Sequence, residues 1–348
     1  MSLRYALPAG LLALAAWVVG LLFAAKAALL GWLVAFLAFS SVAVGCLAVL
    51  MMVVLVPGTW RRLYTGPLLI GSALLPVAAL AAIPILFGLE TLYSWTDPGA
   101  TAAYPAFKAA WLAPAFFVVR QVCYWAILLG LWIALLLFPF ARTGIAAVGL
   151  IVYALIASWM GIDAAETLTP DFHSSIYGLL ILGGQWIAAL AFGIAVGVGA
   201  EDKPPGLAAA GAFMVALLAW AYLHAMQFIV IWAGDIPDEV GWYVARGTHG
   251  WEFVTAALFL VQGFGPFFAI LSPRVRSSRM AMTAIALVTL AMRPVEAAWL
   301  VLPQQHGGWA EWPLAFCALV AMAGLGAAAI AALRRRRPDR FRGDRFFA

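Results

Sequence analysis

Ten long runs of apolar residues follow one another along the chain, and the short segments between them hold most of its charged residues. A helix needs about 20 mostly apolar residues to cross the hydrocarbon core of a bilayer, and each run is close to that length. The pattern therefore predicts ten transmembrane helices. They cover residues 6–24, 33–56, 67–89, 112–138, 144–161, 176–200, 207–233, 251–271, 280–302 and 313–333.

The connections between the runs are short, so we predict an all-α, polytopic membrane protein with one helical domain over residues 1–333. The longest connection opposite the termini, residues 90–111, is interrupted by Pro98 and Pro105 and predicts a loop. Residues 334–348 predict a basic tail. The first run continues into the second, and we interpret it as a retained helix and not as a cleaved signal peptide.

Composition points the same way, since 66% of the residues are hydrophobic, 10% are charged and the mean hydropathy is +1.02. Soluble domains carry about 25% charged residues. In a soluble protein, a net charge of +5 and a pI near 9.3 would suggest binding to nucleic acid. Here the basic residues lie where lipid headgroups and the cytoplasm are expected, so we predict no nucleic-acid partner.

The basic residues also predict the orientation of the chain. With ten spans both termini lie on one side, and 15 of the 20 Lys and Arg residues fall on that side. Three others of the 20, Lys26, Lys108 and Arg246, fall on the opposite side. Positively charged loops stay in the cytoplasm. We therefore expect a multi-pass protein of the bacterial inner membrane with both termini cytoplasmic.

Eight polar residues fall within or beside the outer halves of the predicted spans, where a buried charge costs about 2.5 to 3.5 kcal/mol unless it has a partner. Arg293 and Glu296 are three residues apart on one helical face and predict an ion pair, either structural or functional. Arg120 either snorkels to the interface or meets a carboxylate of another helix. The full set is Arg120, Asp163, Tyr177, Gln185, His224, Gln227, Arg293 and Glu296.

His224 and Gln227 share a face of the seventh span. A histidine there is either a hydrogen-bonded core residue or a group that exchanges protons. Because the inner halves of the spans hold few ionisable residues, the asymmetry favours a polar cavity or half-channel that opens to the outer side. The eight polar residues named above are therefore candidates for a proton path or a quinone site.

Several kinds of chemistry are not indicated. A membrane b-haem needs histidine pairs on facing helices, and the spans hold one histidine. Cys46, Cys123 and Cys317 lack the spacing of a haem or iron–sulfur motif. An HExxH metalloprotease motif is missing too. Binding of an amphipathic ligand, movement of protons or ions, and scaffolding of a complex remain.

Six segments carry a recognisable pattern: residues 31–48, 84–95, 108–120, 163–178, 227–243 and 292–299. The most distinctive reads QFIVIW over residues 227–232 and IPDE over residues 236–239. In these segments the chain resembles the ActF-type membrane subunit of alternative complex III, a bacterial quinol:electron-acceptor oxidoreductase. Through it the chain is similar to the NrfD and polysulfide-reductase membrane-subunit superfamily.

The resemblance implies two four-helix bundles, at about residues 33–161 and 176–302, with flanking helices. It also implies that the chain binds no redox cofactor itself, and that its partners are haem c and iron–sulfur subunits and a paralogous membrane subunit. The expected function is quinone handling, proton translocation and scaffolding in a quinol-oxidising complex. An outer cavity lined by Asp163, Arg293 and Glu296 would accept protons while the partners take the electrons.

Two departures limit what the resemblance transfers. The family's paired histidines correspond to Val53 and Val54, and its Glu-Pro-His segment corresponds to Thr169, Pro170 and Asp171. Two other functions stay open, a stand-alone secondary transporter and a purely structural membrane anchor. Transporters often have Gly- or Pro-interrupted spans in corresponding positions of two repeats, and the sequence shows no evident pair of this kind.

Overall fold

The computed structural model describes residues 3–201, 204–305, 311–336 and 343–347. Within these ranges the chain is helical and contains no strand. Ten helical segments are long and apolar enough to cross a membrane, as the sequence predicts. The protein is therefore an all-α, multi-pass membrane protein.

Eight spans are each built on one continuous helix. These are α1 (Leu3–Phe23), α2 (Ala25–Leu55), α8 (Pro114–Leu137), α9 (Arg142–Ala164), α10 (Tyr177–Glu201), α11 (Leu207–Gly234), α16 (Arg279–Val301) and α17 (Glu311–Arg336). Helix α2 begins eight residues before the predicted run, because only Ala24 separates it from α1.

Two spans are interrupted, which the apolar pattern alone does not predict. The third span consists of α3 (Trp60–Ser72), α4 (Leu75–Ala81) and α5 (Ile83–Phe87). Pro76 and Pro84 lie in the first turns of α4 and α5, because proline has no N–H to continue the preceding helix. The eighth span contains α13 (Trp251–Ala257), the π-helix η4 (Leu258–Phe264) and α14 (Gly265–Leu271).

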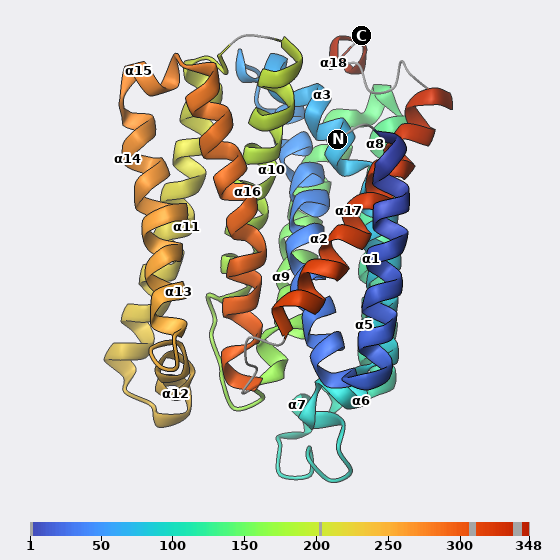
Figure 1. The fold of residues 1–348 in the computed structure, drawn as a ribbon, viewed down its shortest axis with the longest axis vertical. Coiled ribbons are helices and arrows are strands. Elements are labelled where there is room, and N and C mark those ends of the chain that lie inside the picture. The colour runs from blue at the N-terminus through green and yellow to red at the C-terminus, as the bar shows by residue number, and fades with distance from the viewer. Residues whose placement is uncertain (1–2, 202–203, 306–310, 337–342, 348) are drawn as a thin grey trace.

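Short helices connect the spans. They are α6 (Leu89–Leu92), η1 (Ser94–Thr96), α7 (Ala106–Trp111), η2 (Pro139–Ala141), η3 (Glu166–Leu168), α12 (Pro237–Arg246), α15 (Pro273–Arg276), η5 (Pro303–Gln305) and α18 (Gly343–Phe346). The start of α1 and the helix α18 lie at the same end of the molecule, which we call the terminal end (Figure 1). Helices α6, α7 and α12 lie at the opposite end, which we call the distal end (Figure 1).

Helices α2 and α10 form the centre of the array. Helix α2 packs against α3, α9 and α17, and α10 packs against α3, α9, α11 and α16; α2 and α10 also pack against each other. By their order along the chain, we group α2, α3–α5, α8 and α9 as the first bundle and α10, α11, α13–α14 and α16 as the second bundle. Helices α1 and α17 flank the first bundle and pack against α2.

Glycines allow the flanking pair to approach closely. A Cβ atom on Gly324 of α17 would lie 2.5 Å from the backbone oxygen of Ala6 and 2.7 Å from the Cα atom of Gly10, both on α1. Lipid tails are as apolar as the helix surfaces, so close backbone packing at small residues is a main source of association between membrane helices. The α1–α17 contact is of this kind.

Candidate functional site

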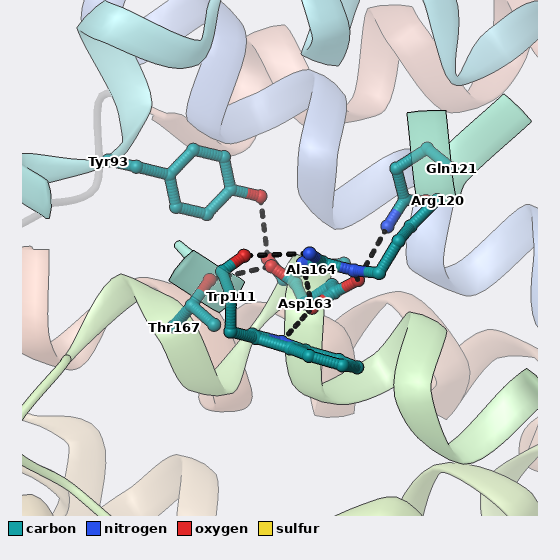
Figure 2. Close-up of polar contacts among 7 residues, drawn as sticks. All are labelled: Tyr93, Trp111, Arg120, Gln121, Asp163, Ala164 and Thr167. Atoms are coloured by element: carbon teal, nitrogen blue, oxygen red, sulfur yellow. Dashed lines mark hydrogen bonds and ion pairs between the residues drawn. The ribbon is translucent and has the colours of Figure 1, made fainter. Parts of the chain in front are cut away.

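The first polar cluster joins α7, α8 and α9 at the distal end, and we call it the Asp163 cluster (Figure 2). Asp163 is fully buried near the end of α9. Its Oδ1 accepts hydrogen bonds from Arg120 Nη2 at 3.0 Å and Trp111 Nε1 at 3.1 Å. Its Oδ2 accepts from Arg120 Nε and Gln121 Nε2, both at 3.2 Å. The carboxylate thus receives four hydrogen bonds from three side chains.

Arg120 is held just as completely. Its Nη1 donates to the backbone oxygen of Trp111 at 2.7 Å, and its guanidinium carbon lies 4.0 Å from the centre of the Trp111 ring. The two-pronged contact with Asp163 has the geometry in which Arg–carboxylate pairs are strongest. Arg120 therefore points inward to a carboxylate of another helix and does not snorkel to the interface.

Further hydrogen bonds fix the chain where α9 ends. The Tyr93 hydroxyl donates to the backbone oxygen of Ala164 at 3.0 Å, and the Thr167 hydroxyl donates to that of Asp163 at 2.6 Å (Figure 2). Burial raises the pKa of Tyr93, and the charge of Asp163 raises it further, so its hydroxyl stays protonated and donates. With donors on every side, the Asp163 cluster acts as a clamp between α7, α8 and α9.

The second polar cluster lies in the second bundle, and we call it the Glu296 cluster. Glu296 of α16 is buried and accepts from Trp220 Nε1 of α11 at 3.0 Å. Its Oε2 accepts from Gln262 Nε2 of η4 at 2.5 Å and also from Arg293 Nη1. The ion pair that the spacing of Arg293 and Glu296 predicts is therefore present, with added donors from two other spans.

One contact in the Glu296 cluster, between His224 and Glu296, is not a hydrogen bond. His224 Nδ1 lies 3.0 Å from the backbone oxygen of Trp220, and because a carbonyl oxygen only accepts, Nδ1 must carry a proton. Its Nε2 lies 3.8 Å from Glu296 Oε1, too far for a hydrogen bond, and is buried with no hydrogen-bond partner among the described residues. Without a proton, the lone pair of His224 Nε2 and the Glu296 carboxylate oxygen repel each other. A proton bound to either atom would make this contact attractive.

Local backbone features bring the Glu296 cluster together. Gln262 belongs to the π-helix η4, and π-helical turns within helices often occur at functional sites. On the other side, Gly184 of α10 leaves room for Arg293, since a Cβ atom there would lie 2.5 Å from Arg293 Nη2. The cluster therefore depends on an irregular turn in one helix and on a missing side chain in another.

An open pocket of about 510 Å³ lies at the distal end beside the Asp163 cluster, and we call it the distal pocket. Its volume is within the range of small-molecule sites, about 300 to 1,000 Å³. Its walls are mostly apolar, with three ionisable groups, Lys108, Glu166 and His173. The lining residues are Phe107, Lys108, Trp111, Leu112, Trp159, Ile162, Glu166, Thr167, Thr169, Pro170, Phe172 and His173.

Hydrogen bonds among the residues of its polar wall hold the distal pocket in shape. Lys108 Nζ donates to the backbone oxygen of Pro170 at 2.6 Å and lies 3.3 Å from His173 Nε2. The Glu166 carboxylate accepts from the backbone N–H of Ser174 at 2.8 Å. These bonds hold the segment that follows α9 over the pocket.

The remaining predicted site residues lie apart from the two carboxylates. Gln185 accepts a hydrogen bond from Tyr153 at 2.7 Å and links α10 to α9. Gln227 is buried on α11 beside Tyr243, and burial raises the pKa of Tyr243. Tyr177 is fully buried at the start of α10, where its ring packs edge to face against Phe172 and Trp242, and its hydroxyl makes no hydrogen bond to a described residue.

The structure places Asp163 in one buried cluster and Arg293 and Glu296 in another, and none of the three side chains lines the distal pocket. The reason is topological, since α9 and α16 belong to different bundles and α2 and α10 pack against both. The pocket is instead formed by α7, α9 and the segment that follows α9.

Four donors to the two carboxylates are missing from the set that the sequence suggests: Trp111, Gln121, Trp220 and Gln262. Gln262 could have been found, since an amide in an otherwise apolar span needs a partner, and Gly263, Gly265 and Pro266 after it indicate an irregular helix. Trp111 and Trp220 carry no such signal, because tryptophan is common both in apolar spans and at interfaces.

Among the residues described, no three His, Cys, Asp or Glu side chains are grouped so that they could hold a metal ion. Arg246 of α12 is a separate buried cation, whose Nη1 and Nη2 donate to the backbone oxygens of Trp242 and Leu300. Burial lowers its pKa to about 9. No protein-family model matches the chain, and a search of curated proteins finds no match to it either.

The clamp role of the Asp163 cluster predicts the effect of removing one charge. Asp163→Asn leaves the Arg120 guanidinium buried without an anion, which costs about 3 to 5 kcal/mol. We expect a clearly lower thermal unfolding temperature in detergent. Arg120→Gln combined with Asp163→Asn should recover part of this loss, whereas Asp171→Asn, at an exposed acidic residue nearby, should change little. Equal losses in the single and double variants would contradict the clamp.

Proposed function

We propose that the chain is the membrane subunit of a bacterial quinol-oxidising respiratory complex, similar to alternative complex III, and that the distal pocket binds the quinol. The distal pocket is the observation that carries this proposal. Its apolar walls suit an isoprenoid-substituted ring, and Glu166 and His173 supply polar groups for the ring hydroxyls. The six sequence segments that resemble the ActF-type subunit support the same assignment.

Oxidation of a quinol releases two protons and two electrons. In this proposal the electrons pass to haem and iron–sulfur groups of partner subunits, and this chain orients the quinol and receives protons. The Glu166 carboxylate is the group of the pocket wall that can accept a proton from a ring hydroxyl. Lys108 donates toward His173 Nε2 at 3.3 Å, which positions the imidazole and leaves its other ring nitrogen protonated, as a donor to a ring oxygen.

The Glu296 cluster is the second part of the proposal. The Asp163 carboxylate has four donors and leaves no site for a further proton, whereas His224 Nε2 and Glu296 Oε1 face each other without a hydrogen bond. A pair of buried groups that share one proton can pass it on when a neighbouring group changes its charge. We therefore assign proton exchange to the Glu296 cluster and scaffolding to the Asp163 cluster.

Orientation follows from the basic residues. The terminal end holds the arginines of α15, of the start of α3, and of the end of α17, including Arg61, Arg274 and Arg335. The positive-inside rule assigns such an end to the cytoplasm. The distal pocket then opens toward the periplasmic side of the inner membrane.

Blocking the pocket tests the quinol site. Ile162→Trp places an indole in the distal pocket and should weaken binding of a quinol analogue to the purified complex by at least about tenfold, which is 1.4 kcal/mol. Ile151→Trp, at an exposed position on the same helix, should leave binding unchanged. Unchanged analogue binding in an Ile162→Trp complex that assembles normally would remove the distal pocket from the function.

Glu296→Gln separates proton exchange from a structural role. The glutamine oxygen still accepts a hydrogen bond from Arg293, so the complex should assemble, while turnover or proton release should fall at least about tenfold. Arg293→Gln added to it should not restore either. Reduced assembly that the double variant rescues would show that the pair is structural. Glu252→Gln, at an exposed glutamate of α13, serves as the control.

Single cysteines test the orientation after Cys46, Cys123 and Cys317 are replaced by alanine. Ala103 and Ser277 are exposed at the distal and the terminal end, respectively. In intact bacterial cells an impermeant maleimide should label Ala103→Cys, and it should reach Ser277→Cys only after the membrane is opened. The opposite pattern would reverse the topology and place the pocket on the cytoplasmic side.

A further inference from the structure

A second cavity lies at the distal end of the second bundle, away from the distal pocket and from both polar clusters. Its volume is about 320 Å³, and it lies between the end of α11 and the short helix α12. We call it the aromatic cavity. Its lining residues are Phe228, Ile231, Trp232, Asp235, Val240 and Tyr243.

Three aromatic rings and one carboxylate meet in the aromatic cavity. The Phe228 and Tyr243 rings contact edge to face with centroids 5.2 Å apart, and Trp232 is 69% exposed. Asp235 ends α11 in the left-handed conformation at φ 47°, a conformation that Asp and Asn tolerate better than most residues. The end of the helix thereby brings a carboxylate next to the rings.

The carboxylate of Asp235 forms no ion pair with any of the described residues. Arg246, the cation of α12, is buried and donates to two backbone oxygens instead. Asp238 and Glu239 follow within the first turn of α12, so the charge around the cavity mouth is negative.

Aromatic faces and a carboxylate together are the chemistry that recognises an alkylammonium group, because ring faces attract cations and the carboxylate adds a direct charge contact. A ligand with only anionic groups would be repelled by Asp235, Asp238 and Glu239. The neighbouring residues of α11 indicate whether the alkylammonium group belongs to a membrane lipid or to a soluble molecule. Ile229 and Val230 are 46% and 59% exposed on a transmembrane helix, so a ligand in the cavity lies beside acyl chains.

We propose that the aromatic cavity binds the ammonium headgroup of a zwitterionic membrane lipid, phosphatidylethanolamine or phosphatidylcholine, at the distal face of the second bundle. The ammonium lies against Trp232, Phe228 and Tyr243 and pairs with Asp235. The acyl chains run along the exposed face of α11 toward the centre of the membrane. This site does not depend on quinol binding in the distal pocket.

The experiment measures lipid binding to the full-length, delipidated protein by native mass spectrometry. The probes are phosphatidylethanolamine, phosphatidylcholine and phosphatidylglycerol with identical acyl chains. The two zwitterionic lipids should bind more tightly than phosphatidylglycerol. Asp235→Asn keeps the left-handed turn and should weaken their binding about three- to fivefold, as expected for loss of one exposed charge contact. Trp232→Leu should weaken it by a similar factor.

Asp238→Asn is the matched control, because it removes the same charge from a neighbouring residue that does not line the cavity. It should leave lipid binding within twofold of the unchanged protein. The proposal fails if phosphatidylglycerol binds as tightly as the zwitterionic lipids, or if Asp235→Asn has no larger effect than Asp238→Asn. Displacement of the lipid by equimolar soluble tetramethylammonium would also overturn it, since the site would then recognise a free cation and not a lipid.

Discussion

A carboxylate enclosed by transmembrane helices is stable only when donors from neighbouring segments surround it, and this constraint organises both bundles of the protein. Asp163 and Glu296 each accept hydrogen bonds from an arginine, a tryptophan and a glutamine. In each case the three donors lie on more than one helix, so satisfying one carboxylate fixes the relative position of several segments. The same requirement explains why a π-helix is tolerated in the eighth span, where it brings Gln262 to Glu296.

The two carboxylates differ in how fully they are hydrogen-bonded. This difference distinguishes the structural role of the Asp163 cluster from the proton exchange that we propose for the Glu296 cluster. Asp163 receives two hydrogen bonds on each oxygen, so any proton that bound it would have to break one. Glu296 faces His224 across 3.8 Å with no hydrogen bond between them. An unsatisfied buried contact costs stability, and one that sets an imidazole nitrogen against a carboxylate is a reason to seek function there.

The sequence predicts the fold better than the site, because transmembrane spans are local features and clusters are not. Apolar runs locate all ten spans, and the three-residue spacing of Arg293 and Glu296 predicts their contact. Arg120 and Asp163 lie 43 positions apart, and only the packing of α8 on α9 pairs them. For the same reason Asp163 and Glu296 belong to different clusters, since similar depth in the membrane does not make two residues neighbours. Pairing with Gln262 depends on a π-helix, which apolar periodicity does not reveal.

Tyr177 is the residue through which the distal pocket and the Glu296 cluster are connected by side-chain packing. It begins α10, the helix that packs against both bundles, and its ring lies edge to face against Phe172 of the pocket wall and against Trp242. Trp242 in turn packs against Trp299, whose ring centre lies 6.0 Å from that of His224. The Tyr177 hydroxyl has no hydrogen-bond partner among the described residues, so a proton route along it requires bound water. The packed rings connect the pocket to His224 without any water, because closely packed side chains transmit small displacements. A mechanical connection between pocket and cluster is therefore a weaker requirement than a continuous proton route, and these ring contacts satisfy it.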